Sequence, residues 1–284
     1  MPFCFGSRIV SNQPLTDYLR EAVQHFSVIE LQADPRYFSQ HFAFTENEKK
    51  ALRIYQERFR FRLTMHAPFI NLSLGSLSLE QRQLSISIFL NAMHTAADLG
   101  ITLMTFHPST IHPGTTDEQY KEICMFEEGS ISILLKEAKK LGLILLIENM
   151  PLTPEYHPNT SDGSRFQELL WLFPEPEFGL TIDIGHALQA GVAIEALLKM
   201  ERIRHFHFHE NDRIKDRHLP IDNNMEWWQK LIKSLVKKFP DAVGILEMLS
   251  LKDQIISCNN LQKSIPKQSG AKHRRELMIP PIIS

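Results

Sequence analysis

This sequence of 284 residues has few cysteines, a net charge close to zero and no long apolar run. Its three cysteines, Cys4, Cys124 and Cys258, are far apart and form no Cys-x-x-Cys pair. That spacing argues against a thiolate zinc site or a disulfide scaffold, and it fits a reducing compartment. The net charge of −2 gives no global basic field of the kind that nucleic-acid binders often carry, although a local patch would not show in the sum.

Membrane and export signals are also lacking. No apolar stretch approaches the length needed to span a bilayer, and the N-terminus has no basic region followed by a long apolar run. We therefore expect a cytoplasmic protein with no membrane partner.

Strand-like and helix-like segments alternate along most of the chain. The expected strands cover residues 3–6, 28–31, 61–65, 102–106, 143–147, 178–182, 203–208 and 243–246, and the expected helices cover 14–25, 45–59, 79–99, 117–141, 164–172, 194–200 and 227–239. Eight such units predict an α/β fold with a parallel sheet, closed as a single (β/α)8 TIM barrel. No glycine-rich phosphate fingerprint follows the first strand, which disfavours a doubly wound dinucleotide-binding sheet.

Helix ends and the chain's C-terminal part give further expectations. Thr45 and Glu48 have the spacing of a capping box, and Gly100 and Gly142 suit helix C-termini. We assign residues 1–250 to the barrel and residues 251–284 to a last helix and a flexible C-terminal tail, which is basic over 267–275. The alternative for the tail is packing on the outside of the barrel.

The stretch Ile203 to His218, IRHFHFHENDRIKDRH, is unusually rich in histidine. Strand alternation places His205, His207 and His209 on one face. We expect His205 and His207 to fill the barrel interior and His209 to reach a site at the end of the strand. The alternative is an exposed, charged edge strand whose histidines bind nothing.

Six consecutive expected strands end in histidine, aspartate or glutamate, where the active site of a TIM barrel lies. Individually, His66 and His107 are equally well explained as turn residues before proline. An unpaired buried Glu148 would be costly, and Gly185 is expected to allow a tight bend that brings Asp183 and His186 together. The strand-end residues are His66, His107, Glu148, Asp183 with His186, His209 with Asp216 and His218, and Glu247.

These side chains offer nitrogen and oxygen ligands but no sulfur. Such a set suits Mn²⁺, Zn²⁺, Co²⁺, Mg²⁺ or Fe²⁺, and its size is enough for more than one ion.

The chain resembles the xylose-isomerase-like TIM barrels, a group of sugar and sugar-phosphate isomerases and epimerases that also includes endonuclease IV, which cleaves DNA at abasic sites. The resemblance covers about Met65 to Glu247. It rests on the motifs His66-Ala-Pro-Phe, His107-Pro, Ile147-Glu-Asn, Ile182-Asp-Ile-Gly-His, His209-Glu-Asn-Asp, Asp216-Arg-His-Leu-Pro and Leu246-Glu.

In the epimerase branch the resemblance implies one divalent ion and a small sugar or polyol substrate. Glu148 and Glu247 would also be the acid/base pair, moving a proton through a metal-stabilised enediolate. Four further residues would contact substrate oxygens. The implied ligands are Glu148, Asp183, His209 and Glu247, and the implied substrate contacts are His186, Arg217, His66 and His107.

In the endonuclease IV branch the same ligands would join a multinuclear zinc site that cleaves a phosphodiester in nucleic acid. The additional metal ligands would be His66, His107, His186, Asp216 and His218.

Two departures disfavour the nuclease. The segment after Asn149 lacks that branch's glycine-rich loop, and the loop between His209 and Asp216 is short. Further along, Ile221-Asp-Asn-Asn stands where the family usually has a Gly-x-Gly turn, a departure that affects the substrate loop in both branches. Phe69 and the Arg36-Tyr37 pair would suit base-stacking wedges, but packing and loop anchoring explain them better.

A metal-dependent sugar isomerase or epimerase is therefore our main hypothesis. The nuclease and a non-catalytic barrel that retains its metal site are the alternatives.

Overall fold

A closed barrel of parallel strands forms the centre of the computed structural model, which describes residues 3–10, 14–34 and 44–263. The strands pair in chain order and β1 closes on β8, so the predicted TIM barrel is confirmed. The strands are β1 (Cys4–Arg8), β2 (Val28–Gln32), β3 (Arg62–His66), β4 (Leu103–Phe106), β5 (Ile144–Glu148), β6 (Phe178–Asp183), β7 (Ile203–Phe208) and β8 (Val243–Leu246).

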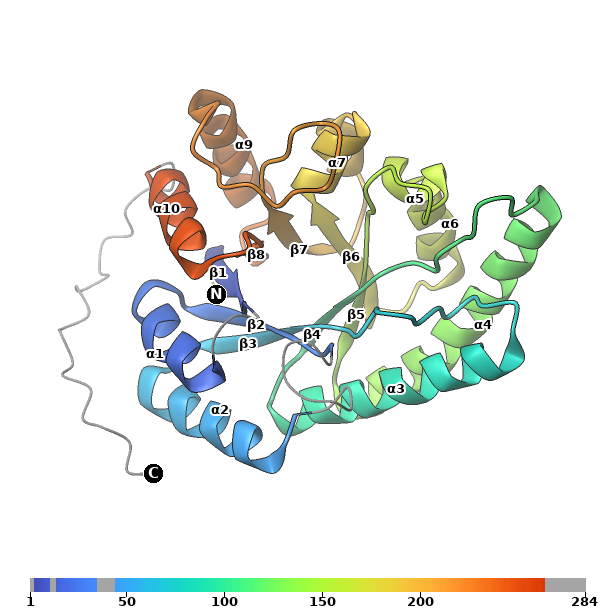
Figure 1. The fold of residues 1–284 in the computed structure, drawn as a ribbon, viewed down its shortest axis with the longest axis horizontal. Helices are drawn as coiled ribbons and strands as arrows, with labels where there is room; N and C mark the ends of the chain where they lie inside the picture. The colour runs from blue at the N-terminus through green and yellow to red at the C-terminus, as the bar shows by residue number, and fades with distance from the viewer. Residues whose placement is uncertain (1–2, 11–13, 35–43, 264–284) are drawn as a thin grey trace.

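Helices surround the strands, as Figure 1 shows with α9 and α10 on one side of the barrel and α2 and α3 on the other. The short helices α5 and α7 were not predicted from the sequence. The helices are α1 (Leu15–His25), α2 (Glu46–Phe59), α3 (Leu79–Asp98), α4 (Asp117–Leu141), α5 (Pro158–Asp162), α6 (Ser164–Leu172), α7 (Ile184–Ala190), α8 (Ile194–Leu197), α9 (Met225–Lys238) and α10 (Leu251–Gln262).

Local sequence signals set several helix ends. The capping box of Thr45 and Glu48 is present at the start of α2, where each residue's side chain accepts from the other's backbone N–H. Gly142 ends α4 in the left-handed conformation, with a φ of 69°. Gly100 has the same φ and directly follows the C-cap of α3. Both glycine predictions are therefore confirmed.

Strand β7 lies within the barrel wall, since it pairs with β6 and with β8. Phe206 and Phe208 face the helices, where Phe208 packs edge-on against Trp228 at 6.2 Å between ring centroids. His205 and His207 are wholly buried on the other face of the strand. The edge-strand alternative is therefore wrong, because both sides of β7 are hydrogen-bonded and both faces are covered.

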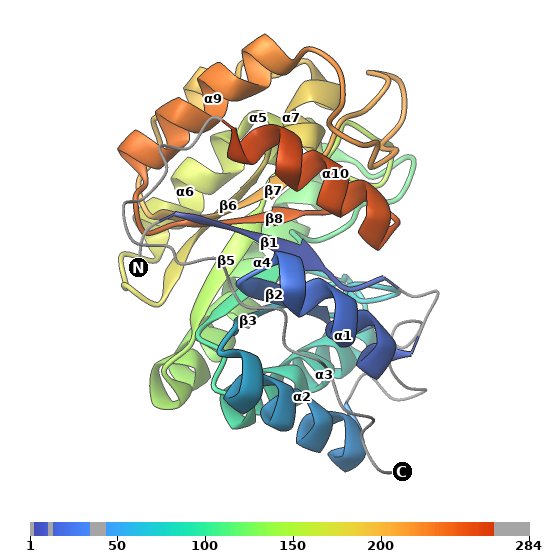
Figure 2. The same ribbon diagram turned by 90° about the vertical axis from the view of Figure 1, so that its left-hand side faces the viewer.

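Helix α10 follows the last strand and contacts α1, α9, β1 and β8, a position that Figure 2 shows beside α1. Its N-cap is Ser250, whose side chain accepts from the Asp253 N–H. The expected flexible tail at 264–284 and the Arg36-Tyr37 pair lie outside the described residues. Within the described part of the chain, no helix is both long enough and apolar enough to cross a bilayer.

Candidate metal centre

The C-terminal ends of the strands bring the predicted site residues together. His66, Glu148 and Asp183 are the last residues of β3, β5 and β6, and His107, His209 and Glu247 directly follow β4, β7 and β8. Five of these six side chains are buried, and His107 is half-buried. Three groups with donor atoms within 4.8 Å of one another form there, namely His66–His107–Glu148, Glu148–Asp183–His207–Glu247 and His186–His209–Asp216–His218.

The first group has the dimensions of a metal site. The Nε2 atoms of His66 and His107 are 3.1 Å apart, and each lies 3.3 Å from Glu148 Oε2. These separations match roughly 3.3 Å, the edge of a tetrahedron whose centre is about 2.0 Å from each ligand atom. One divalent ion would fit between the three side chains.

Glu148 also belongs to the second group, which it forms with Asp183, Glu247 and His207. His207 Nδ1 lies 2.5 Å from Glu148 Oε1, 3.5 Å from Glu247 Oε1 and 3.9 Å from Asp183 Oδ2. His207 was expected to fill the barrel interior and was not among the predicted ligands, whereas His209 was. The alternation of β7 places both histidines on the same side of the strand, but it does not tell how far each one reaches toward the carboxylates.

The third group contains His209, whose Nε2 is 3.2 Å from Asp183 Oδ1 and 3.7 Å from Asp216 Oδ1. Asp216 Oδ2 also lies 3.0 Å from His218 Nε2 and 3.3 Å from His186 Nε2. Asp183 therefore connects this group to the second one through its two oxygens. The loop after β7 completes the group, as its Asp-x-His motif indicated.

Asp183 and His186 are brought together by the first turn of helix α7, not by a bend at Gly185. Asp183 is the N-cap of α7 and accepts a 2.7 Å hydrogen bond from the His186 N–H, so the backbone continues as a helix. The predicted tight bend at Gly185 is wrong. Gly185 lies inside α7, where a Cβ atom would overlap the ring of His209. Because Gly185 has no side chain, the His209 ring can pack directly against the backbone of α7.

Burial and mutual pairing shift the pKa values of the site in opposite directions. Burial alone would raise the pKa of Glu148, but the charge of His207 and the close contacts of His107, His207 and His66 hold it well below its ordinary value. In the same way, the charges of His186 and His209 lower the pKa of Asp183 to about 2 against the effect of burial. Burial would lower the pKa of His186, but Asp183 and Asp216 raise it to about 10. The carboxylates are therefore ionised and ready to bind cations.

Several buried polar atoms at the centre make no hydrogen bond. They are Glu148 Oε2, Asp183 Oδ2, His209 Nε2, Asp216 Oδ1 and Glu247 Oε1. Unpartnered buried polar atoms are costly and rare, and bound ions are one common reason for them. This donor set fits divalent cations with nitrogen and oxygen ligands.

Two arginines near the strand ends differ in their burial. Arg217 pairs with Asp212 at 2.6 Å and its side chain is 54% exposed, so the structure leaves it on the outer part of the loop. Arg8, the last residue of β1, is buried, and its guanidinium lies 3.6 Å from Glu247 Oε2. Arg8 closely follows the first expected strand, residues 3–6, so its place at a strand end was visible in the sequence, but only histidine and acidic residues were predicted to belong to the site.

Sequence comparison assigns this barrel to a family. The profile of the family described as "Xylose isomerase-like TIM barrel" matches residues 19–265. The chain belongs to the xylose isomerase-like TIM barrel family. A curated relative, the uncharacterized protein MJ1311 of Methanocaldococcus jannaschii, is 24% identical over 269 residues, which cover 90% of this chain and 87% of the relative.

Solved structures with the same fold include sugar epimerases. A D-tagatose 3-epimerase-like protein has a TM-score of 0.78 and 24% identity, covering 92% of this chain and 96% of its own. A D-psicose 3-epimerase solved with D-fructose has a TM-score of 0.69 and 15% identity, with 92% and 96% covered. A Thermus thermophilus protein soaked with ZnCl₂ has a TM-score of 0.67 and 23% identity, with 92% and 97% covered.

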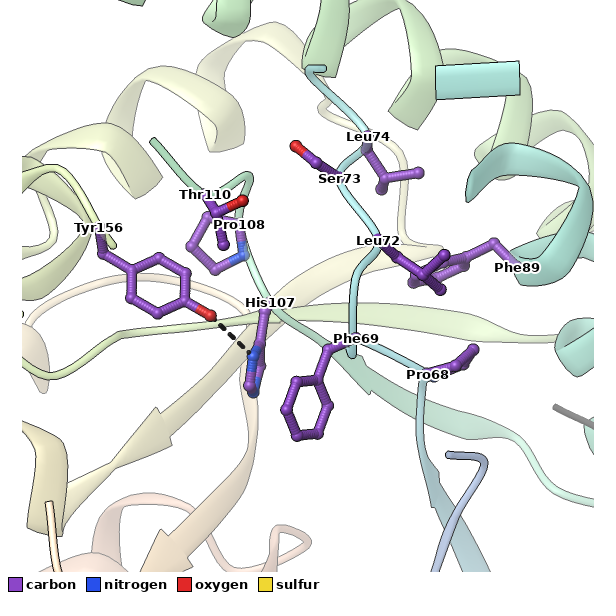
Figure 3. A pocket seen from close by; sticks show the side chains of 10 residues that line it. All are labelled: Pro68, Phe69, Leu72, Ser73, Leu74, Phe89, His107, Pro108, Thr110 and Tyr156. Atoms are coloured by element: carbon purple, nitrogen blue, oxygen red, sulfur yellow. Dashed lines mark hydrogen bonds between the residues drawn. The ribbon is translucent and has the colours of Figure 1, made fainter. Parts of the chain in front are cut away.

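In this xylose isomerase-like barrel, a small pocket opens beside His107 (Figure 3). His107 Nδ1 is 3.2 Å from the Tyr156 hydroxyl, and the Phe69 ring lies 4.5 Å from the His107 ring, centroid to centroid. Phe69 also packs edge-on against His66 at 5.4 Å. The two aromatic side chains therefore flank the first group of ligands, with Phe69 packed on both of its histidines.

Proposed function

We propose that this protein is a divalent-metal-dependent isomerase or epimerase of a sugar or sugar phosphate. The observation that carries the proposal is the convergence of two glutamates. Glu148 and Glu247 come from β5 and β8, yet both carboxylates approach His207 Nδ1, at 2.5 and 3.5 Å. Moving a proton at a carbon next to a carbonyl requires one group to remove it and one to return it.

The chain's own residues supply the positions for this proton transfer. Burial would raise the pKa of Glu148, but His207 and the neighbouring histidines hold it well below its ordinary value, so this carboxylate is unprotonated at neutral pH and free to accept a proton. Glu247, 3.6 Å from the Arg8 guanidinium, is the second acid/base group. We assign Asp183 and His209 as further metal ligands and His186, His66 and His107 as substrate contacts or additional ligands. When bound, a divalent ion would polarise the substrate carbonyl and stabilise the enediolate.

The family and its neighbours support this choice of chemistry. The chain belongs to the xylose isomerase-like barrels, and similar structures include epimerases of D-tagatose and D-psicose type. Ketoses of this kind are therefore the first substrates to test.

The direct test measures proton exchange. The protein, loaded separately with Mn²⁺, Co²⁺, Zn²⁺ or Mg²⁺, is incubated in D₂O with D-fructose, D-tagatose, D-psicose and their phosphates. We expect deuterium in one recovered sugar, at the carbon next to the carbonyl, and loss of this exchange in Glu148→Gln. Absence of exchange with every sugar and metal would contradict the proposal and leave the nuclease and the non-catalytic barrel.

One observation favours a second candidate, an endonuclease IV-type phosphodiesterase acting on abasic-site DNA. His66 and His107 form a compact group with Glu148, with all three separations between 3.1 and 3.3 Å. An ion bound there in addition to one at Asp183 and Glu247 would suit phosphodiester cleavage. Chelator-sensitive incision of an abasic-site duplex, lost in His66→Gln, would favour this candidate over the isomerase.

A further inference from the structure

A second set of buried ligand atoms lies in the barrel interior. It consists of Glu30 on β2 and of His205 and His207 on β7, all with an exposed fraction of 0%. TIM-barrel interiors are typically filled by branched apolar side chains, so a carboxylate and two imidazoles are unusual there. We infer that Glu30, His205 and His207 form a binding site for a structural divalent cation of the zinc class. This inference goes beyond the proposed function, because it requires no substrate.

The distances within this interior group are those of ligands around a common centre. Glu30 Oε1 lies 3.1 Å from His207 Nε2, and Glu30 Oε2 lies 3.2 Å from His205 Nε2. Ligand atoms about 2.0 Å from a tetrahedral ion are roughly 3.3 Å apart. One nitrogen from each ring and one carboxylate oxygen all fall within 4.8 Å of one another.

Three of the nitrogen and oxygen atoms in this interior group have no hydrogen-bond partner. Glu30 Oε1, His205 Nε2 and His207 Nε2 are buried and make no hydrogen bond, although the ion-pair distances are short. The two rings therefore lie close to the carboxylate without hydrogen-bond geometry toward it. Three buried polar atoms without partners would be costly, and a bound cation would satisfy all of them.

Each of the three residues also contacts a further side chain. His207 Nδ1 is 2.5 Å from Glu148 Oε1, His205 Nδ1 is 3.5 Å from Thr105 Oγ1, and the Thr64 hydroxyl donates a 3.0 Å hydrogen bond to Glu30 Oε2. Metal-binding histidines typically donate their second ring N–H to a carboxylate or another oxygen. That arrangement leaves each Nε2 lone pair available to the cation.

A cation in this position would also affect the centre above it. Fixing His207 by Nε2 sets the ring so that its Nδ1–H donates to Glu148.

The first test uses the wild-type protein. Crystals grown with zinc and measured at the zinc absorption edge should show an anomalous peak about 2.0–2.2 Å from Glu30, His205 Nε2 and His207 Nε2. A map with peaks only at the strand ends would overturn the inference.

The second test compares His205→Gln with His94→Gln. His94 is a suitable control because its side chain is 56% exposed and pairs only loosely with Glu137 at 3.5 Å. After dialysis against limiting zinc, mass spectrometry should find one ion fewer per chain in His205→Gln and no change in His94→Gln. Equal zinc content in the two variants would overturn the inference.

Glu30→Gln provides a second variant if His205→Gln does not fold, and the anomalous map of the wild type needs no variant at all. Sugar turnover is measured in neither test, so failure of the proposed function would leave these results unchanged.

Discussion

The ring of His209 occupies the space in which a side chain on residue 185 would have to lie. The two residues come from different elements, α7 and the end of β7, and Asn211 strengthens the contact by donating a 2.8 Å hydrogen bond to the Gly185 carbonyl. Gly185 thus allows helix α7 to lie directly against a candidate metal ligand.

Gly185→Ala should therefore destabilise the protein and displace His209. Overpacking a buried position typically costs about 1–3 kcal/mol, and the free energy of unfolding in urea measures this loss. The matched control is Gly129→Ala in α4, where a Cβ would meet nothing within 4 Å. That change should stabilise the helix by roughly 0.5–1 kcal/mol. Equal effects of the two substitutions would show that the His209 contact is unimportant.

Glu148→Gln and Glu247→Gln should each abolish sugar turnover while leaving the fold intact. Loss of a general acid or base typically reduces the rate by about 10²–10⁴-fold. Glu226→Gln is the control, because Glu226 pairs with Lys230 on the exposed surface. Turnover is measured with the best metal and sugar, and circular dichroism checks the fold. Near wild-type activity in either site variant would refute the acid/base assignment.

Removal of divalent ions should lower the melting temperature, and zinc should restore it. The centre contains unpartnered oxygens of Glu148, Asp183 and Glu247 that a cation would satisfy. An ion present at 100 times its dissociation constant stabilises the folded state by about 2.7 kcal/mol. Melting curves with chelator, and with zinc added back, measure the difference. Identical curves would mean that the folded chain does not bind these ions.

His66→Gln should lower the metal content without unfolding the protein. His66 is a donor in only the first of the three strand-end groups, so the loss should be confined to an ion bound in that group. Zinc per chain, measured by mass spectrometry after dialysis, should fall by one ion relative to the wild type. An unchanged zinc content would argue that His66 contacts substrate instead of metal.

Arg165→Ala should cause a large loss of stability away from the site. Arg165 and Glu127 form a 3.1 Å ion pair in which both side chains are almost completely buried. Breaking a buried pair leaves an uncompensated charge and typically costs about 3–5 kcal/mol. Lys230→Ala is the control, since its pair with Glu226 is exposed and should contribute little. Urea unfolding of both variants tests the contrast, and similar midpoints would contradict the burial argument.

Much of the barrel could be read from local patterns. The period of apolar residues and the end signals located α4 and α6 at their observed bounds, Asp117–Leu141 and Ser164–Leu172. Short helices such as α7 were missed, because seven residues that follow a strand directly carry too few repeats to show a period.

The sequence by itself determined the fold class and the chemical nature of the site. Parallel strands all present their C-terminal ends at one face, so residues that follow strands must meet there. Only the tertiary structure decided which of these residues share a centre. Distances across the barrel depend on register and side-chain direction, which put His207 among the carboxylates, Arg8 beside Glu247 and Arg217 on the exposed loop. These distances could not be predicted from the sequence, because the residues that they join are separated by up to 239 positions along the chain.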